Sequence, residues 1–434
     1  MDPVSSFSLP PVHRTWRAVF CAALFTLGCL PSSPAQSERS PVREHFDLKL
    51  NLDTLLSSPT LWETSADQLD SLFTKDKFKS NPYFKWLSES RESARFSKQP
   101  YNNVSVDITL FNGEVHADEV VVGFKQGRLD SVNVSLYNRG DSGSISKDDF
   151  NERYRAAGAH IGQWLGVHPV ERAPSTDTAL KLGGWLWSSP TTLALLEYNA
   201  TALVKPSSAE FLRLKLGPPS ERDALLHIAA IGRDTNTLKR SELPQFVKKE
   251  SNGDVYVGSV PMVDQGAKGY CVCASCQRIF EYFHIPCDEH ELAALAGSSA
   301  ERGTNSREME MTLKKMEPKF KVHFKPLIEK YPGRRSGANR LERPDHFLKM
   351  IQDYVDKGVP LLWGLEVGLV PEEPALSVQT RGGHMRLIIG YNTTKDQILF
   401  TDSWGQGHEL KRMKLEDAIN ATGAIYDLEP RDFY

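Results

Sequence analysis

The stretch from Val260 to Cys276 constrains this chain of 434 residues more than any other. A Gly-rich turn that includes Gly266 and Gly269 leads to Cys271, and the residues after it form a helical stripe: Cys273, Cys276, Phe280 and Phe283. Cys271 lies off this stripe, at the predicted start of the helix, where free backbone N–H groups and the helix dipole favour a thiolate. The pattern predicts a helix whose first residue is a candidate nucleophile.

Two blocks far downstream supply the partners that a nucleophilic thiol needs. His384 follows Gly382-Gly383 and precedes an apolar run, so it lies at the start of a predicted buried strand. Asp402 ends the next predicted strand. A thiol needs a base within hydrogen-bond reach, and the imidazole needs a third group that fixes its tautomer. Cys271, His384 and Asp402 are of these three types, and the side-chain amide of Gln265 can join the Cys271 backbone N–H in an oxyanion hole.

These blocks resemble the papain-like cysteine peptidases, in particular the bacterial branch related to the bacteriocin-leader (double-glycine) peptidases. The resemblance covers roughly residues 255 to 434 and rests on five blocks in order: Gln265, Cys271, Gly383-His384, Gly390-Tyr391 and Asp402-Ser403-Trp404-Gly405. It implies helices that carry Cys271 packed against a twisted sheet that carries His384 and Asp402. Val272 and Asp402 occupy positions where the papain family proper has Trp and Asn.

The resemblance also implies an activity. Cys271 is the implied nucleophile, His384 the base, Asp402 the orienting residue and Gln265 the oxyanion residue, in a hydrolase that acts on a protein or peptide and needs no metal or organic cofactor. Two other functions remain open: a catalytically inactive binding protein on a peptidase fold, and a cell-wall amidase or transglutaminase-like acyl transferase with a similar Cys, His and acid. Thiolate reactivity separates the inactive protein from the enzymes.

The remaining cysteines of this region allow other interpretations. Cys271, Cys273, Cys276 and Cys287 are four in number, which would suit a disulfide-bonded set in an exported chain. Cys273 and Cys276 lie on the apolar stripe and are expected to pack as small hydrophobic residues, or one of them pairs with Cys287. Zinc is a weak alternative, because the sequence lacks two spaced C-x-x-C pairs. Two other residues, His290 and His408, have no evident partner and are expected at the surface.

The start of the chain has the pattern of a secretory signal peptide, residues 1–35. Basic residues precede an apolar run from Ala18 to Leu30, which is shorter than the roughly 20 residues needed to cross a bilayer. Cleavage is expected after Ala35, or alternatively lipid is attached at Cys29, which would be the only membrane contact. We therefore expect a periplasmic, extracellular or lipid-anchored protein.

Between the signal and the catalytic block, the pattern predicts two further parts. Residues 36–103 are expected to form a polar, partly helical lead-in, and residues 104–240 an antiparallel sheet with one long helix that begins after Ser146 and stops at Gly166. With the papain-like region at 250–434, the expected fold class is α+β. The sheet domain precedes the catalytic region as a propeptide would, so it is expected to dock substrate, to cover the cleft or to serve as a scaffold.

Composition excludes several other classes of protein. With 52 basic and 55 acidic side chains, the formal net charge is -3, which gives no general electrostatic reason to bind nucleic acid. The charged content of 25% and the 40% hydrophobic content are those of a folded globular protein. The sequence also contains no P-loop, dinucleotide fingerprint or H-E-x-x-H motif, so nothing in it supports nucleotide-dependent or zincin chemistry.

Overall fold

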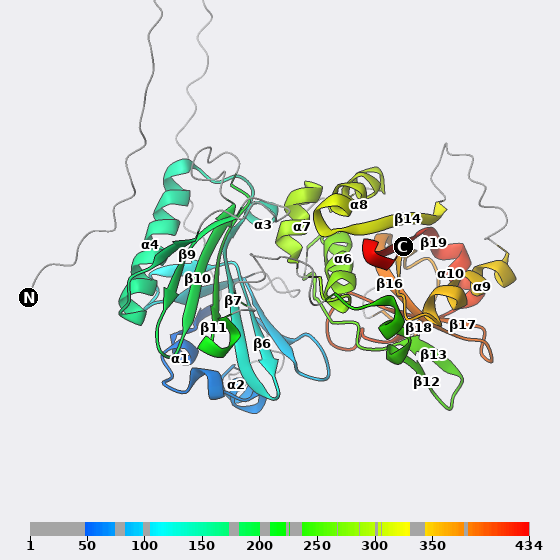
Figure 1. Cartoon of the computed structure of the whole chain (residues 1–434), viewed down its shortest axis with the longest axis horizontal. Helices are drawn as coiled ribbons and strands as arrows, with labels where there is room; N and C mark the ends of the chain where they lie inside the picture. The colour runs from blue at the N-terminus through cyan, green and yellow to red at the C-terminus, as the bar shows by residue number, and fades with distance from the viewer. Residues whose placement is uncertain are drawn as a thin grey trace, which may run out of the picture.

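The computed structural model describes residues 48–73, 83–98, 105–172, 182–199, 209–222, 225, 237–266, 268–285, 287–299, 303–304, 306–329, 343–376 and 381–433. The predicted signal peptide, with Cys29 and Ala35, lies outside these residues. Figure 1 shows two bodies side by side, an N-terminal one coloured blue to green and a C-terminal one coloured green to red, with α7 (Glu289–Ala296) where they meet.

The N-terminal body is built on an eight-stranded sheet in which every neighbouring pair is antiparallel. In spatial order its strands are β2 (Phe84–Trp86), β3 (Ser93–Ser97), β6 (Glu119–Lys125), β7 (Arg128–Asn138), β11 (Phe211–Gly217), β10 (Leu193–Asn199), β9 (Leu182–Ser188) and β8 (Val170–Arg172). A second, three-stranded sheet pairs β1 (Leu48–Asn51) in parallel with β4 (Val106–Leu110), which pairs in turn with β5 (Val115–Ala117).

One long helix, α4 (Lys147–Leu165), covers a face of the large sheet, as the sequence predicts. The side chain of Ser146 caps its first turn by accepting a hydrogen bond from the backbone N–H of Asp149. Gly166 ends it in the left-handed conformation, with φ of +65°, which glycine adopts without a steric penalty. Phe150, Tyr154 and Ile161 lie on its buried face.

The expectation of a separate lead-in at 36–103 is wrong for its described residues, because these are part of the folded body, although the expected helical stretches are present. They supply β1, β2 and β3, the helices α1 (Asp53–Leu56) and α2 (Ala66–Phe73), and the 3-10 turn η1 (Leu61–Glu63), with Leu69 and Phe96 fully buried. These strands are only three to five residues long, and their pairing partners lie far away in sequence, so alternation within each segment gives little signal. The turn at Asn112-Gly113 joins β4 to β5 in the three-stranded sheet.

The C-terminal body is built on a third sheet, which is wholly antiparallel and has helices packed against it. Along the sheet run β12 (Val247–Lys249), β13 (Asp254–Val257), β16 (Gly382–Asn392), β15 (Leu361–Val367), β19 (Thr422–Pro430) and β14 (Val322–Glu329), while β17 (Gln397–Thr401) pairs with β16 and with β18 (Lys411–Lys414). The helices are α6 (Cys271–Tyr282), α7, α8 (Ser306–Phe320), α9 (Pro344–Val355) and α10 (Leu415–Ala421). Short turns complete the described structure: α3 (Arg139–Ser142), η3 (Pro219–Glu221), η4 (Arg240–Phe246) and η6 (Arg431–Phe433).

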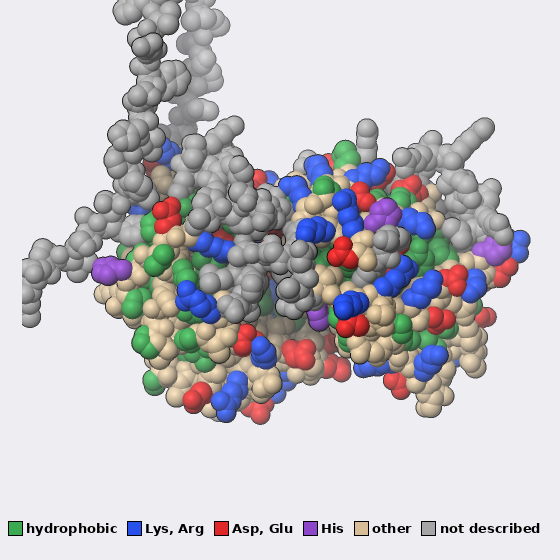
Figure 2. All heavy atoms as spheres, viewed as in Figure 1, with side chains coloured by type: hydrophobic (Ala, Val, Ile, Leu, Met, Phe, Trp, Pro, Cys, Tyr) green, Lys and Arg blue, Asp and Glu red, His purple; other side chains and the backbone are tan. Residues whose placement is uncertain are grey.

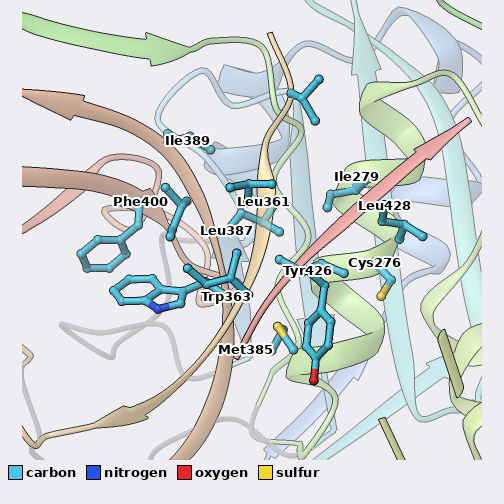
Figure 3. Packing of buried hydrophobic residues seen from close by; sticks show 14 of the residues in the cluster. Cys276, Ile279, Leu361, Trp363, Met385, Leu387, Ile389, Phe400, Tyr426 and Leu428 are labelled. Atoms are coloured by element: carbon cyan, nitrogen blue, oxygen red, sulfur yellow. The ribbon is translucent and has the colours of Figure 1, made fainter. Parts of the chain in front are cut away.

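The core of this body lies between α6 and the sheet. Figure 3 shows Cys276 and Ile279 of α6 beside apolar residues of the central strands, among them Leu361, Met385 and Tyr426. Each of these five residues is at most 1% exposed. Because the strand that carries His384 continues directly into this core at Met385, close packing fixes the position of His384.

The surface carries charges of both signs. On the face shown in Figure 2, basic and acidic side chains are interspersed and form no extended patch of one sign. Among the described residues, no helix has both the length and the apolar character that a bilayer span requires.

Candidate active site

Cys271 is the first residue of α6, as the sequence predicts. Its side chain is partly buried, and the stripe residues behind it, Cys273, Cys276, Phe280 and Phe283, are completely buried in the core. The structure therefore places a single thiol of this cluster at the end of the helix where backbone N–H groups are free.

His384 lies opposite Leu365 in the antiparallel pair of β16 and β15, near the start of β16. Its Nε2 is 2.6 Å from Oδ1 of Asp402, which follows the end of β17. The His384 ring also interacts with the Cys271 thiol, whose pKa it lowers. Because Nε2 is taken by Asp402, the other ring nitrogen, Nδ1, is the one left for the thiol. Three residues separated by as many as 131 positions thus come together at one site.

The charges of these groups support one another. Burial lowers the pKa of His384, but the Asp402 carboxylate and its hydrogen bond outweigh that effect and raise the pKa from 6.5 to about 9. Burial raises the pKa of Cys271, but the hydrogen bond and charge of His384 reverse this and leave it below its ordinary value. Asp402 stays ionised, since His384 and Arg386 together overcome the cost of its burial and depress its pKa. The site therefore favours a thiolate beside an imidazolium.

Gln265 lies beside the acid end of this chain. Its backbone N–H donates to the carbonyl of Ser403 over 2.9 Å, and its Oε1 accepts a hydrogen bond from the Ser403 hydroxyl at 2.7 Å. Its Nε2 donates to the carbonyl of Lys268 at 2.7 Å, three residues before Cys271. These contacts fix which way the amide points and leave its second N–H as a donor.

Trp404 covers the imidazole. Its ring stacks on His384 with centroids 4.5 Å apart and an angle of 23° between the planes. The guanidinium of Arg386 lies 5.3 Å from the centroid of the Trp404 ring. The stack places the ring of this motif residue on the His.

Arg386 is a member of the site that sequence reasoning missed. It is completely buried two residues after His384, and its Nε is 2.6 Å from Oδ2 of Asp402. Its other nitrogens hold Glu372 at 2.7 and 3.2 Å, and Lys411 contacts the same Glu372. Opposite charges thus alternate behind the triad, from His384 to Lys411. The residues around Arg386 in β16 are mostly apolar, and such a strand indicates core packing. The sequence therefore contains no sign that Arg386 pairs with Asp402.

Arg278 is a second missed residue, and it ties the helix of Cys271 to the strand of Asp402. From α6 it donates to the carbonyl of Asp402 at 2.7 Å, to the Thr401 hydroxyl at 2.6 Å and to the carbonyl of Pro261 at 2.7 Å. It lies two turns after Cys271, so an Arg inside a helix that is expected to be buried is the available signal.

The expectation that His290 and His408 lie at the surface is wrong. His290 is buried at the junction of the two bodies, 3.7 Å from Asp141 and 3.8 Å from Glu289. His408 packs against Trp404 edge to face, and burial lowers its pKa. The contact of His290 with Asp141 is not visible in sequence, because Asp141 comes from a distant segment.

One group among the described residues has the spacing of a metal site: Glu119, Glu289 and His290. Two cations already contact Glu119, since Arg95 Nε lies 3.0 Å away and Lys268 Nζ 3.2 Å away. A divalent ion would have to compete with both, so this group fits an ion-pair network better than a metal centre. Cys271, Cys273, Cys276 and Cys287 are all free thiols, which leaves the disulfide and zinc interpretations of them without structural support.

A cysteine at a helix start in contact with a histidine on an antiparallel sheet is the arrangement of the papain-like fold. Comparison with family models places residues 257–426 in the Peptidase_C39 like family. The predicted resemblance to the papain-like, bacteriocin-leader peptidase branch is therefore confirmed for the C-terminal region.

Two solved structures are similar to this chain. One is the peptidase domain of Streptococcus ComA, a bi-functional ABC transporter involved in a quorum sensing pathway, with 14% identity, 39% of this chain and 98% of that chain covered, and a TM-score of 0.27. The other is xylellain, a cysteine protease from Xylella fastidiosa, with 13% identity, 46% and 92% coverage, and a TM-score of 0.26. The search of curated proteins gives no match.

Proposed function

We propose that this protein is an exported cysteine peptidase that hydrolyses peptide or isopeptide bonds through Cys271, His384 and Asp402, with Gln265 in the oxyanion hole. The observation that carries the proposal is the hydrogen bond of His384 to Asp402 together with the interaction of the His384 ring with the Cys271 thiol at the start of α6. The family of residues 257–426 supports a peptide substrate. Export is proposed from the charged start and apolar run of residues 1–35.

In the proposed mechanism, the Cys271 thiolate attacks the carbonyl carbon of the substrate and forms a C–S bond. The carbonyl oxygen becomes an oxyanion, which accepts hydrogen bonds from the Cys271 backbone N–H and the second N–H of Gln265. The C–N bond then breaks as the protonated His384 gives its proton to the leaving amine. Neutral His384 next takes a proton from water, which attacks the thioester and releases the acid and the thiolate.

The environment of His384 suits both proton transfers. Asp402 keeps Nε2 occupied and stabilises the imidazolium, so the proton that moves is the one on the nitrogen that faces Cys271. Trp404 stacked on the ring limits water on that side. Together these contacts hold the imidazole in one orientation through the whole cycle.

The proposal is tested by replacing the nucleophile in the form that begins at Gln36. Cys271→Ala should abolish hydrolysis of a mixed peptide library, followed by mass spectrometry, and should leave the thermal unfolding midpoint unchanged. Cys273→Ala, which removes a buried thiol two residues away, is the matched control and should keep its turnover. Normal turnover in Cys271→Ala would dismiss this site.

A further inference from the structure

Ion pairs and hydrogen bonds join the N-terminal body to the loop that carries Gln265. Lys85, from β2, places its Nζ 3.1 Å from Oδ2 of Asp264 and 2.6 Å from the carbonyl oxygen of Trp404. Asp264 immediately precedes Gln265, and Trp404 is the residue stacked on His384. One ammonium group of the N-terminal sheet therefore joins the oxyanion loop to the loop that covers the base.

Arg95, from the neighbouring strand β3, contacts the same loop from a buried position. Its guanidinium lies 3.3 Å from the carbonyl oxygen and 3.5 Å from Oδ1 of Asp264. It also lies against Gly266, where an added Cβ would come within 2.1 Å of the guanidinium. Gly266 has φ of +70°, so both its backbone and its contact with Arg95 require glycine.

At the far end of the loop the charges are reversed: the loop supplies the cation, and the N-terminal body supplies the acids. Lys268 Nζ lies 2.8 Å from Asp141 Oδ2, on α3, and 3.2 Å from Glu119 Oε2, on β6. The carbonyl of the same Lys268 receives the side-chain N–H of Gln265. Asp264, which precedes Gln265, and Lys268, which follows it, thus both contact the N-terminal body.

Breaking these contacts costs free energy because the Asp264 carboxylate is buried. Its side chain has 0% exposure, and Oδ1 also accepts the backbone N–H of Gly266 at 2.9 Å. Without Lys85 or Arg95, this carboxylate would lose a cationic partner in a place that water does not reach. The loop would then shift to solvate it, and the Gln265 amide would move with the loop.

We infer that Lys85 and Arg95 are positioning residues for the catalytic loops, so the N-terminal body is a permanent part of the active site and not a removable cover. The inference rests on the proposed function, because it gives Gln265 a task in catalysis. Lys85 is the better residue to test: its side chain is 37% exposed, so its loss leaves no large cavity, whereas Arg95 is 5% exposed.

The first test is hydrogen exchange of the full chain in the segments 262–270 and 402–406, read by mass spectrometry. Lys85→Met should speed exchange there about tenfold, the ratio that corresponds to one lost charge-assisted hydrogen bond. Lys85→Arg should restore most of the protection. The matched control is Lys125→Met, which removes an exposed lysine paired with Glu221 inside the N-terminal body and should change nothing in either segment. Unchanged exchange in Lys85→Met would overturn the inference.

The second test separates positioning from general loosening. Acylation by N-acetylglycine p-nitrophenyl ester passes through an oxyanion, whereas alkylation by iodoacetamide uses the same thiolate without one. Lys85→Met should acylate about tenfold more slowly and alkylate at Cys271 within twofold of the wild-type rate. Equal loss in both reactions, or loss in neither, would contradict a positioning role. Failure of the proposed function looks different: wild-type alkylation at Cys271 would then be insensitive to His384→Ala.

Discussion

Asp402 and Arg386 form a buried ion pair, in which Oδ2 of Asp402 lies 2.6 Å from Nε of Arg386. His384 contacts the other carboxylate oxygen, Oδ1. A carboxylate that served His384 alone would be free to rotate away from the imidazole. Here both oxygens are occupied, and Ser403 N–H adds a third contact, 2.8 Å from Oδ1. The orientation of His384 therefore depends on residues that never reach the thiol.

Replacing Arg386 should destabilise the fold because it leaves two buried acids short of a partner. Arg386→Met should lower the free energy of unfolding, measured in urea, by about 3 kcal/mol, since Asp402 keeps His384 and Glu372 keeps Lys411. The triple variant Arg386→Met/Glu372→Met/Lys411→Met, which removes Glu372 and its remaining partner together, should recover part of this loss. A single variant as stable as the wild type would show that the network contributes nothing.

The hydrogen bonds of Arg278 predict a comparable loss of stability. Arg278→Met removes three hydrogen bonds, two of them fully buried, and should cost about 3 kcal/mol, measured by urea unfolding. Arg91→Met, which breaks an ion pair with the exposed Asp67, is the control and should cost less than about 1 kcal/mol. Equal effects of the two variants would mean that Arg278 does not fasten α6 to β17.

The raised pKa of His384 predicts how stability depends on pH. Its interaction with Asp402 should be fully present below the ordinary value of 6.5 and be lost as the pH rises through about 9. In a Cys271→Ala background, which removes the competing titration of the thiol, His384→Asn should therefore cost about 2 kcal/mol more at pH 6 than at pH 9.5. Urea unfolding at both pH values measures this difference. A cost independent of pH would place the imidazole outside the influence of Asp402.

The three inner cysteines should not compete with Cys271 for thiol reagents. Burial raises the pKa of Cys273, Cys276 and Cys287, and none of them contacts His384 in the described structure. A disulfide reagent added to the form that begins at Gln36 should therefore titrate one thiol at pH 7 and all four only after denaturation. Rapid reaction of two or more thiols in the native protein would contradict this burial.

Sequence patterns anticipated the parts of this molecule whose signals are local. The helix at 147–165 follows from Ser146 and Gly166, because caps act within one turn. The start of α6 at Cys271 follows from the Gly-rich turn before an apolar stripe. The order of the catalytic blocks then identified the family, and its match to residues 257–426 confirms that step.

Contacts between distant segments were out of reach. Nothing near Lys85 in the sequence indicates Asp264, 179 positions away, and Arg386 has no local sign of its pairing with Asp402. The short strands β2 and β3 likewise gain stability from their neighbours in the sheet and not from their own composition. These pairings arise only when the chain is folded, which is why the first body was taken for a separate lead-in and sheet.

The most direct measurement of the central claim is the pH dependence of labelling by an irreversible papain-class thiol inhibitor, from pH 5 to 8, with the labelled residue mapped by mass spectrometry. We predict labelling confined to Cys271, already rapid well below the ordinary thiol pKa of 9.0 because His384 stabilises the thiolate, and at least tenfold slower at pH 6 in His384→Ala. Slow labelling spread over several cysteines, with no effect of His384→Ala, would contradict an activated nucleophile and favour a non-catalytic binding protein.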